Sequence, residues 1–194
     1  MKIGFFGGTF NPVHRGHIEN AQQAKEQLKL DKVIFIPDKK PVHKDIEESI
    51  TAEDRYEMLT RVVAEYEGFE VSRIEIDREE PSYTIITIET LKKEYPQCEL
   101  YMIIGADSFN EIDTWKDYTR IIESVTVVVL RRKTDPILRD DIYGIITKLE
   151  IIDNEYIDIS STGLRKKIKQ KERVDGQIPD KALEYIKEKR LYLT

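Results

Sequence analysis

Short apolar runs alternate with helix-spaced apolar residues along most of this chain of 194 residues. Apolar side chains at Ile18, Ala21, Ala24 and Leu28, for example, recur at the spacing of one helix face. The apolar runs predict strands at residues 2–6, 32–37, 69–76, 98–105, 124–130 and 156–160. Because strands joined by crossover helices run parallel, we expect an α/β fold: a Rossmann-like, doubly wound parallel sheet of about five to six strands with flanking helices.

Boundary signals indicate where several of the helices begin and end. The segment "TAED" fits a capping box, with Thr51 as N-cap and Asp54 at the third helical position. Pro96 closes one predicted helix and Pro179 introduces another. These later helices are predicted at 84–95, 162–171 and 180–189. No linker divides the sequence convincingly, so we expect one domain over residues 1–194 with C-terminal helices from about residue 161.

Composition excludes several classes of protein. The formal net charge is −6, which argues against a nucleic-acid partner, because phosphate-backbone binding needs a basic surface. Cys98 is the single cysteine, so no internal disulfide framework is expected. The apolar run at 125–130 is far too short to span a bilayer, and the N-terminus lacks a signal-peptide pattern. We therefore expect a cytoplasmic protein without a membrane partner.

The segment "GGTFNPVHRGH" at residues 7–17 follows the first predicted strand and opens the first predicted helix. Ligands of open α/β sheets bind at the carboxyl ends of strands. Gly7, Gly8 and Gly16 let backbone approach a ligand closely, and a helix N-terminus attracts phosphate. Two of the three histidines in the chain, His14 and His17, would lie beside that point.

Other interpretations of this segment are open on the residues alone. It contains neither the Gly-Lys-Ser/Thr of a Walker A loop nor the G-x-G-x-x-G dinucleotide fingerprint. A zinc site lacks a third ligand nearby, and no metal ligands are predicted. A plain glycine turn with incidental surface histidines is the simplest alternative.

The segment resembles the H-x-G-H signature of the nucleotidyltransferase superfamily, here "HRGH" at 14–17. A second segment, "ISSTGLR" at 159–165, resembles the I-S-S-T-x-x-R motif of the same superfamily. Arg165 presents a charged fork suited to phosphate oxygens. Taken alone, the serines fit an ordinary N-cap, and the basic run that ends at Arg173 fits a solvated helix face.

The resemblance extends over nearly the whole chain to the bacterial nicotinate-nucleotide adenylyltransferases. Besides the first motif, the matching pieces are "PDKKPVHK" (37–44), "DRYEML" (54–59), "GADSFNEIDTWKD" (105–117) and "IPDKALEYIKEKRLY" (178–192). One departure is Asn11, where that family often has Asp. Phosphopantetheine adenylyltransferases are the nearest rival family, but they are typically shorter and usually have Thr at the position of His14.

The resemblance implies an enzyme that transfers AMP directly from ATP to nicotinate mononucleotide, giving deamido-NAD and pyrophosphate in NAD biosynthesis. It implies His14, His17 and Arg165 as catalytic residues, with His17 at the α-phosphate. Mg²⁺ would be held mainly by the ATP phosphates. Its partners would be the two nucleotides, and a homo-oligomer is compatible with the sequence.

The resemblance also implies two sets of binding residues. Those expected at ATP are Gly7, Gly8, Thr9, Phe10, Gly16, Gly105, Asp107, Ser160, Ser161 and Thr162. Those expected at nicotinate mononucleotide are Thr84, Trp115, Lys116, His43 and Lys44. Without the resemblance, Asp107 fits a turn or cap, Trp115 a core or interface aromatic, and the segment around His43 a charged surface loop.

Two other functions stay open at this point. Another transferase of the superfamily would use a different acceptor, such as the amidated mononucleotide, phosphopantetheine or a sugar phosphate. A non-catalytic nucleotide sensor on the same fold would bind ATP without releasing pyrophosphate, although intact His14, His17 and Arg165 argue against it.

Overall fold

The computed structural model describes residues 1–39, 50–131, 138–153 and 159–193. Its centre is a six-stranded sheet in the order β3-β2-β1-β4-β5-β6, and every pairing is parallel. The strands are β1 (Lys2–Gly8), β2 (Lys32–Pro37), β3 (Phe69–Val71), β4 (Glu99–Gly105), β5 (Thr126–Arg131) and β6 (Leu149–Asp153). The strand order reverses direction between β1 and β4, which is where ligands bind in open α/β sheets.

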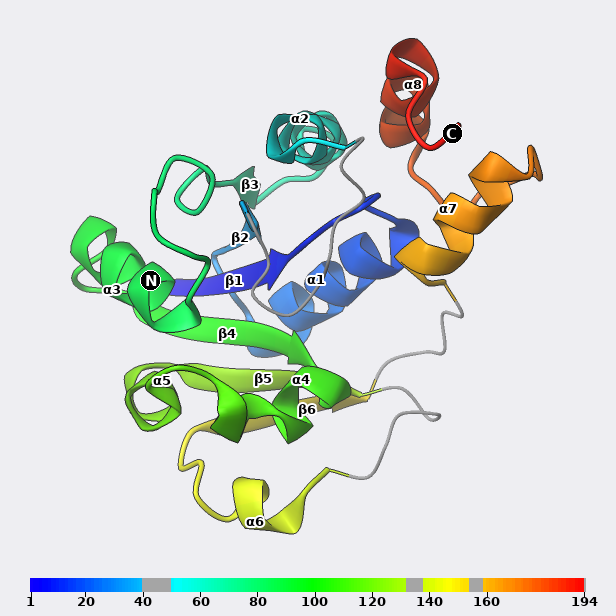
Figure 1. Ribbon diagram of the computed structural model, residues 1–194. Helices are drawn as coiled ribbons and strands as arrows, with labels where there is room; N and C mark the ends of the chain where they lie inside the picture. Colours follow the sequence, from blue (N-terminus) through cyan, green and yellow to red (C-terminus); the bar gives the residue numbers. More distant parts are fainter. Residues whose placement is uncertain (40–49, 132–137, 154–158, 194) are drawn as a thin grey trace.

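Helices cover both faces of this sheet (Figure 1). The first face carries α1 (Arg15–Leu28), α2 (Ala52–Val63), α7 (Ser161–Lys169) and α8 (Asp180–Lys189). The second carries α3 (Thr84–Glu94), α4 (Ala106–Asn110), the 3₁₀ turn η1 (Ile112–Thr114), α5 (Tyr118–Ser124) and α6 (Asp140–Tyr143). The expected Rossmann-like, doubly wound α/β architecture is therefore confirmed.

Alternation along the strands explains the two cores. In β5, Val128 and Leu130 pack into one core cluster, whereas Val127 and Val129 pack into the other. Successive side chains of a strand point to opposite faces, so a strand covered on both faces is apolar throughout. In β1, a Cβ added to Gly4 would come within 2.8 Å of Leu30 and 3.1 Å of Ile103, so the glycine allows close packing there.

Most predicted elements are present, and the differences have local causes. The capping box of α2 is formed: Thr51 Oγ1 accepts from the Asp54 N–H at 3.0 Å, and Asp54 accepts from the Thr51 N–H at 3.1 Å. The strand predicted at 69–76 ends at Val71, because the Ser72 hydroxyl accepts the Ile74 N–H and starts a turn.

The predicted strand at 156–160 was wrong in its described part, since Ile159 and Ser160 lead directly into α7. The sixth strand is β6, which ends at Asp153. Its residues are mostly exposed, so the apolar signal of a buried strand is weak there. Within the described ranges, no helix has the length and apolar content needed to cross a membrane.

Candidate active site

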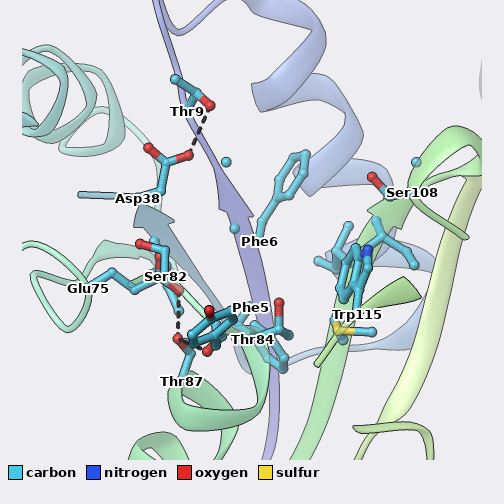
Figure 2. Close-up of a pocket in the computed structure, with 18 of the residues that line it drawn as sticks. Phe5, Phe6, Thr9, Asp38, Glu75, Ser82, Thr84, Thr87, Ser108 and Trp115 are labelled. Atoms are coloured by element: carbon cyan, nitrogen blue, oxygen red, sulfur yellow. Dashed lines mark hydrogen bonds between the residues drawn. The ribbon is translucent and has the colours of Figure 1, made fainter. Parts of the chain in front are cut away.

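A cavity of about 590 Å³ opens at the carboxyl ends of β1, β2 and β4 (Figure 2). Seven residues that the sequence assigned to substrate binding line it: Gly7, Gly8, Thr9, Thr84, Gly105, Trp115 and Lys116. They come from segments that lie up to 109 positions apart, counted from Gly7 to Lys116 (116 − 7). The topological switch between β1 and β4 thus brings together residues from both predicted sets.

Two of the lining glycines leave open space where a side chain would be. A Cβ added to Gly7 or to Gly105 would meet no atom within 4 Å, although both glycines line the cavity. Gly8 differs, because its added Cβ would come within 3.2 Å of the Phe10 ring. Gly7 and Gly105 therefore leave room for a ligand, whereas Gly8 lets the Phe10 ring pack against the backbone.

An aromatic wall faces a polar wall across the cavity. Figure 2 shows Trp115 on one side and Glu75, Ser82 and Thr87 on the other. Trp115 is partly buried and packs against the core beneath α3 and α5, which leaves part of the indole available to a planar ring. Beside it, the Lys116 ammonium lies 4.5 Å from the centre of the Tyr83 ring, a cation–π contact.

The polar wall contains two buried carboxyl groups that sequence reasoning did not identify as site residues. The first, Asp38, accepts a hydrogen bond from the Thr9 hydroxyl at 2.9 Å and one from Arg55 Nη1 at 3.1 Å. Arg55 is fully buried and also donates to the carbonyls of Thr9 at 2.7 Å and Asp38 at 2.6 Å. Burial lowers the pKa of Arg55, and the neighbouring Asp38 carboxylate opposes that change.

The second carboxyl group belongs to Glu75. It accepts a hydrogen bond from the Thr87 hydroxyl at 2.6 Å, and Arg78 Nη2 lies 3.9 Å from the same oxygen. Burial raises the pKa of Glu75, and the Thr87 hydrogen bond partly offsets that rise. Lys39 connects this wall to the end of β2, since its Nζ donates to the Arg78 carbonyl at 2.7 Å.

The two histidines of the first motif lie at the start of α1. His14 is the N-cap, and its backbone N–H donates to Nδ1 of His17 at 3.2 Å. The two rings are stacked with their centres 3.7 Å apart, and Phe10 packs edge-on against His17 at 5.0 Å. A nitrogen that accepts cannot carry the proton, so neutral His17 carries its proton on Nε2 and can donate from there.

The second motif docks on the loop that carries the first. Arg165 Nη1 donates to the Asn11 carbonyl at 2.8 Å across 154 positions of sequence. The Ser161 hydroxyl donates to the Pro12 carbonyl at 3.1 Å. Ser160 caps α7 by accepting the Gly163 N–H at 3.1 Å, and Thr162 Oγ1 accepts from Arg165 at 3.3 Å. The structure therefore brings the two motifs into direct contact.

The other predicted residues that the structure describes do not line the cavity. Phe10 is buried in the core at a backbone φ of 48°, and Gly16 is buried within α1. Asp107 lies in the first turn of α4, two residues after Gly105. His43 and Lys44 lie outside the described residues. Neither His14, His17 nor the α7 residues line this cavity.

Comparison with known proteins agrees with these observations. The cytidylyltransferase-like family matches residues 5–167. A probable nicotinate-nucleotide adenylyltransferase of Opitutus terrae is 40% identical over 193 residues, covering 99% of this chain and 98% of that protein. The protein of the same name in Dictyoglomus turgidum is 37% identical over 195 residues, covering 99% and 96%.

Solved structures show the same fold. Plasmodium falciparum nicotinic acid mononucleotide adenylyltransferase complexed with NaAD superposes with a TM-score of 0.83 at 18% identity, covering 98% of this chain and 97% of that one. A putative nicotinate-nucleotide adenylyltransferase from Vibrio parahaemolyticus superposes with a TM-score of 0.68 at 17% identity, covering 100% of this chain and 96% of that one. On its sequence matches, the chain belongs to the cytidylyltransferase-like family and, within it, to the nicotinate-nucleotide adenylyltransferases.

Proposed function

We propose that this protein is the enzyme that transfers AMP from ATP to nicotinate mononucleotide, giving deamido-NAD and pyrophosphate in NAD biosynthesis. The observation that carries the proposal is the docking of Arg165 and Ser161 on the Asn11–Pro12 turn, directly before the stacked histidines. This contact joins two helix N-termini, those of α1 and α7, each of which attracts phosphate. The family to which the chain belongs supports the same reaction.

The reaction needs positioning and charge stabilisation more than covalent chemistry. A phosphate oxygen of the mononucleotide attacks the α-phosphorus of ATP, and the bond to the bridging oxygen breaks as pyrophosphate leaves. The acceptor is already a nucleophile, so no enzyme intermediate is required. We propose that His17 donates from Nε2 to the α-phosphate as negative charge develops, with His14 holding its ring in place.

For the leaving phosphates we propose Arg165, together with Ser161 and Thr162 in the first turn of α7. Within the described ranges, no group of three or more His, Cys, Asp or Glu side chains is arranged to hold a metal ion. The described residues therefore do not offer Mg²⁺ a cage of protein ligands. We propose that the ion is held by ATP phosphates and water.

For the acceptor we propose the part of the 590 Å³ cavity beside Trp115, whereas Gly7, Gly8, Thr9 and Gly105 of the same lining are proposed for ATP. The indole of Trp115 would stack on the pyridine ring, with Thr84 and Lys116 near it. His43 and Lys44 are proposed for its phosphate on sequence resemblance. Gly105 and Asp107 would lie at the ATP ribose, where the open space beside Gly105 supports a close approach. Because both substrates are water-soluble nucleotides, we expect a cytoplasmic enzyme.

Pyrophosphate release tests the proposal. Purified protein receives ATP and Mg²⁺ with either nicotinate mononucleotide or nicotinamide mononucleotide. We expect rapid release with the acid form and a loss of about 10²–10³ in kcat for His17→Ala, the size of one oxyanion-type donor. Release with the amide alone would overturn the acceptor. ATP binding without release for either acceptor would favour a nucleotide sensor.

A further inference from the structure

The turn between β1 and α1 is held by groups from distant parts of the chain. The Thr9 carbonyl accepts from Arg55 on α2, and the Asn11 carbonyl accepts from Arg165 on α7. The turn is also strained, because Phe10 adopts a left-handed φ of 48°. A non-glycine residue keeps such a conformation only where its surroundings impose it. The shape of this turn therefore depends on the external donors.

A third donor is Tyr192, which follows α8. The Tyr192 hydroxyl donates to Oδ1 of Asn11 at 2.6 Å, across 181 positions of sequence. Tyr192 is 3% exposed and Asn11 is 5% exposed, so water does not compete effectively for this hydrogen bond. The contact links the C-terminal segment to the residue that leads into the histidine motif.

The C-terminal backbone is bent to make this contact. After α8 ends at Lys189, Arg190 has a φ of 53° and Tyr192 a φ of 65°, both left-handed. Leu191 packs into the core between them. Figure 1 shows the segment that follows α8 lying beside that helix. Two unfavourable backbone conformations within three residues place the Tyr192 ring inside the protein, where its hydroxyl reaches Asn11.

Asn11 joins two of the external contacts. Its carbonyl oxygen receives Arg165, and its side-chain oxygen receives Tyr192. The Tyr192 hydrogen bond fixes the Asn11 side chain, and a fixed side chain restrains the Asn11 backbone whose carbonyl accepts from Arg165. The orientation of the Arg165 guanidinium is thereby coupled to the Tyr192 hydroxyl through a single residue.

We propose that Tyr192 is a positioning residue for the ATP-phosphate side of the site, acting through Asn11 on Arg165 and on the turn into His14. This inference rests on the proposed function for its kinetic effect. It adds a role for a residue 27 positions beyond Arg165 (192 − 165). Because Tyr192 does not line the acceptor cavity, its hydroxyl should affect ATP use more than acceptor binding.

The test compares Tyr192→Phe with Tyr185→Phe. Tyr185 on α8 also donates one hydrogen bond to a side-chain oxygen, Asp54 Oδ1 at 2.9 Å, but its partner lies on α2 and not on the turn. We expect Tyr192→Phe to lower kcat/KM for ATP roughly fivefold to tenfold, the factor that one hydrogen bond supplies, with KM for the acceptor unchanged. Tyr185→Phe should change neither value beyond about twofold.

A double-variant cycle tests whether the effect passes through Asn11. In an Asn11→Ala background, Tyr192→Phe should add no further loss, whereas Asn11→Asp, which keeps an acceptor oxygen, should retain the effect of Tyr192→Phe. Equal kinetics for Tyr192→Phe and Tyr185→Phe, or additive losses in the cycle, would overturn the proposal. Thermal unfolding of each variant identifies a variant that merely fails to fold.

Calorimetric ATP binding separates this proposal from the proposed function. If the unaltered protein releases no pyrophosphate, the proposed function fails, but the ATP dissociation constant still reports on Tyr192. An increase for Tyr192→Phe and none for Tyr185→Phe would support positioning at the phosphates. Unchanged ATP affinity together with unchanged kcat would refute it.

Discussion

Replacing the buried Arg55 tests whether the cavity wall depends on one internal cation. The guanidinium makes four hydrogen bonds, to Asp38 Oδ1 and to the carbonyls of Thr9, Asp38 and Lys39. Arg55→Met keeps an apolar stem of similar length and removes every donor. It leaves a buried carboxylate without its cation, and breaking such a pair typically costs about 3–5 kcal/mol.

Urea denaturation measures this loss directly, because the midpoint falls while the slope m stays constant. For a chain of this size each kcal/mol shifts Tm by about 2–4 °C, so the expected decrease is about 6–20 °C. The matched control is Arg61→Met on the same helix. Arg61 pairs with Glu57 and Glu188 at the surface, each at 2.9 Å, and exposed pairs contribute about 0–1 kcal/mol.

A loss below about 1.5 kcal/mol for Arg55→Met, or one equal to that of Arg61→Met, would refute the argument, since the buried-pair cost would then be absent. The double variant Arg55→Met/Asp38→Asn sharpens the comparison. Asp38→Asn removes the negative charge that Arg55→Met leaves unpaired. The loss of unfolding free energy in the double variant should therefore be smaller than the sum of the losses in the two single variants.

Three further predictions concern the cavity. Burial raises the pKa of Glu75 above its usual 4.5, so this carboxyl stabilises the folded state fully below pH 4.5 and less as pH rises through the folded-state pKa. The unfolding free energy of Glu75→Gln minus that of the unaltered protein should therefore increase with pH above 4.5. A difference that does not change with pH would exclude the raised pKa. Trp115→Ala should weaken acceptor binding by about 1–3 kcal/mol, the contribution of one stacked ring. The KM for nicotinate mononucleotide should rise while the KM for ATP stays unchanged. A higher KM for ATP with an unchanged KM for nicotinate mononucleotide would contradict the assignment of Trp115 to the acceptor. Gly105→Ala should change the free energy of unfolding by no more than about 0.5 kcal/mol, because the added Cβ meets no atom within 4 Å and the backbone φ is −82°. The affinity for nucleotide, measured by calorimetry, should fall. An unchanged affinity would remove Gly105 from the site.

Buried parallel strands and capped helices were predictable because their signals are local. The apolar run of β5 and the capping box at Thr51 need no knowledge of distant residues. The edge strand β6 lacked that signal, because its side chains are largely exposed. The short elements α4, η1 and α6 span at most five residues each, too few for a helical period to appear.

The cavity wall was harder to predict because it depends on pairing between distant side chains. Arg55 falls on the same helix face as Met58, Leu59 and Val62, at the spacing of buried residues. A charged residue on an apolar face indicates a buried partner, so this signal was present in the sequence. The partner, Asp38, could not be identified from the spacing, since it follows another strand.

The contacts of the β1–α1 turn bear on how a direct transfer can be organised. Thr9 lines the cavity and bonds to Asp38, whereas Asn11, two residues later, bonds to Arg165 and Tyr192. One short strained turn therefore connects the cavity to the proposed site of the ATP phosphates. In-line transfer without a covalent carrier requires both substrates to be placed to within a fraction of an ångström, since a displacement of about 1 Å can cost a factor of about 10² in rate. A turn held by hydrogen bonds from Arg55, Arg165 and Tyr192 suits that requirement, because its residues are restrained from three separate parts of the chain.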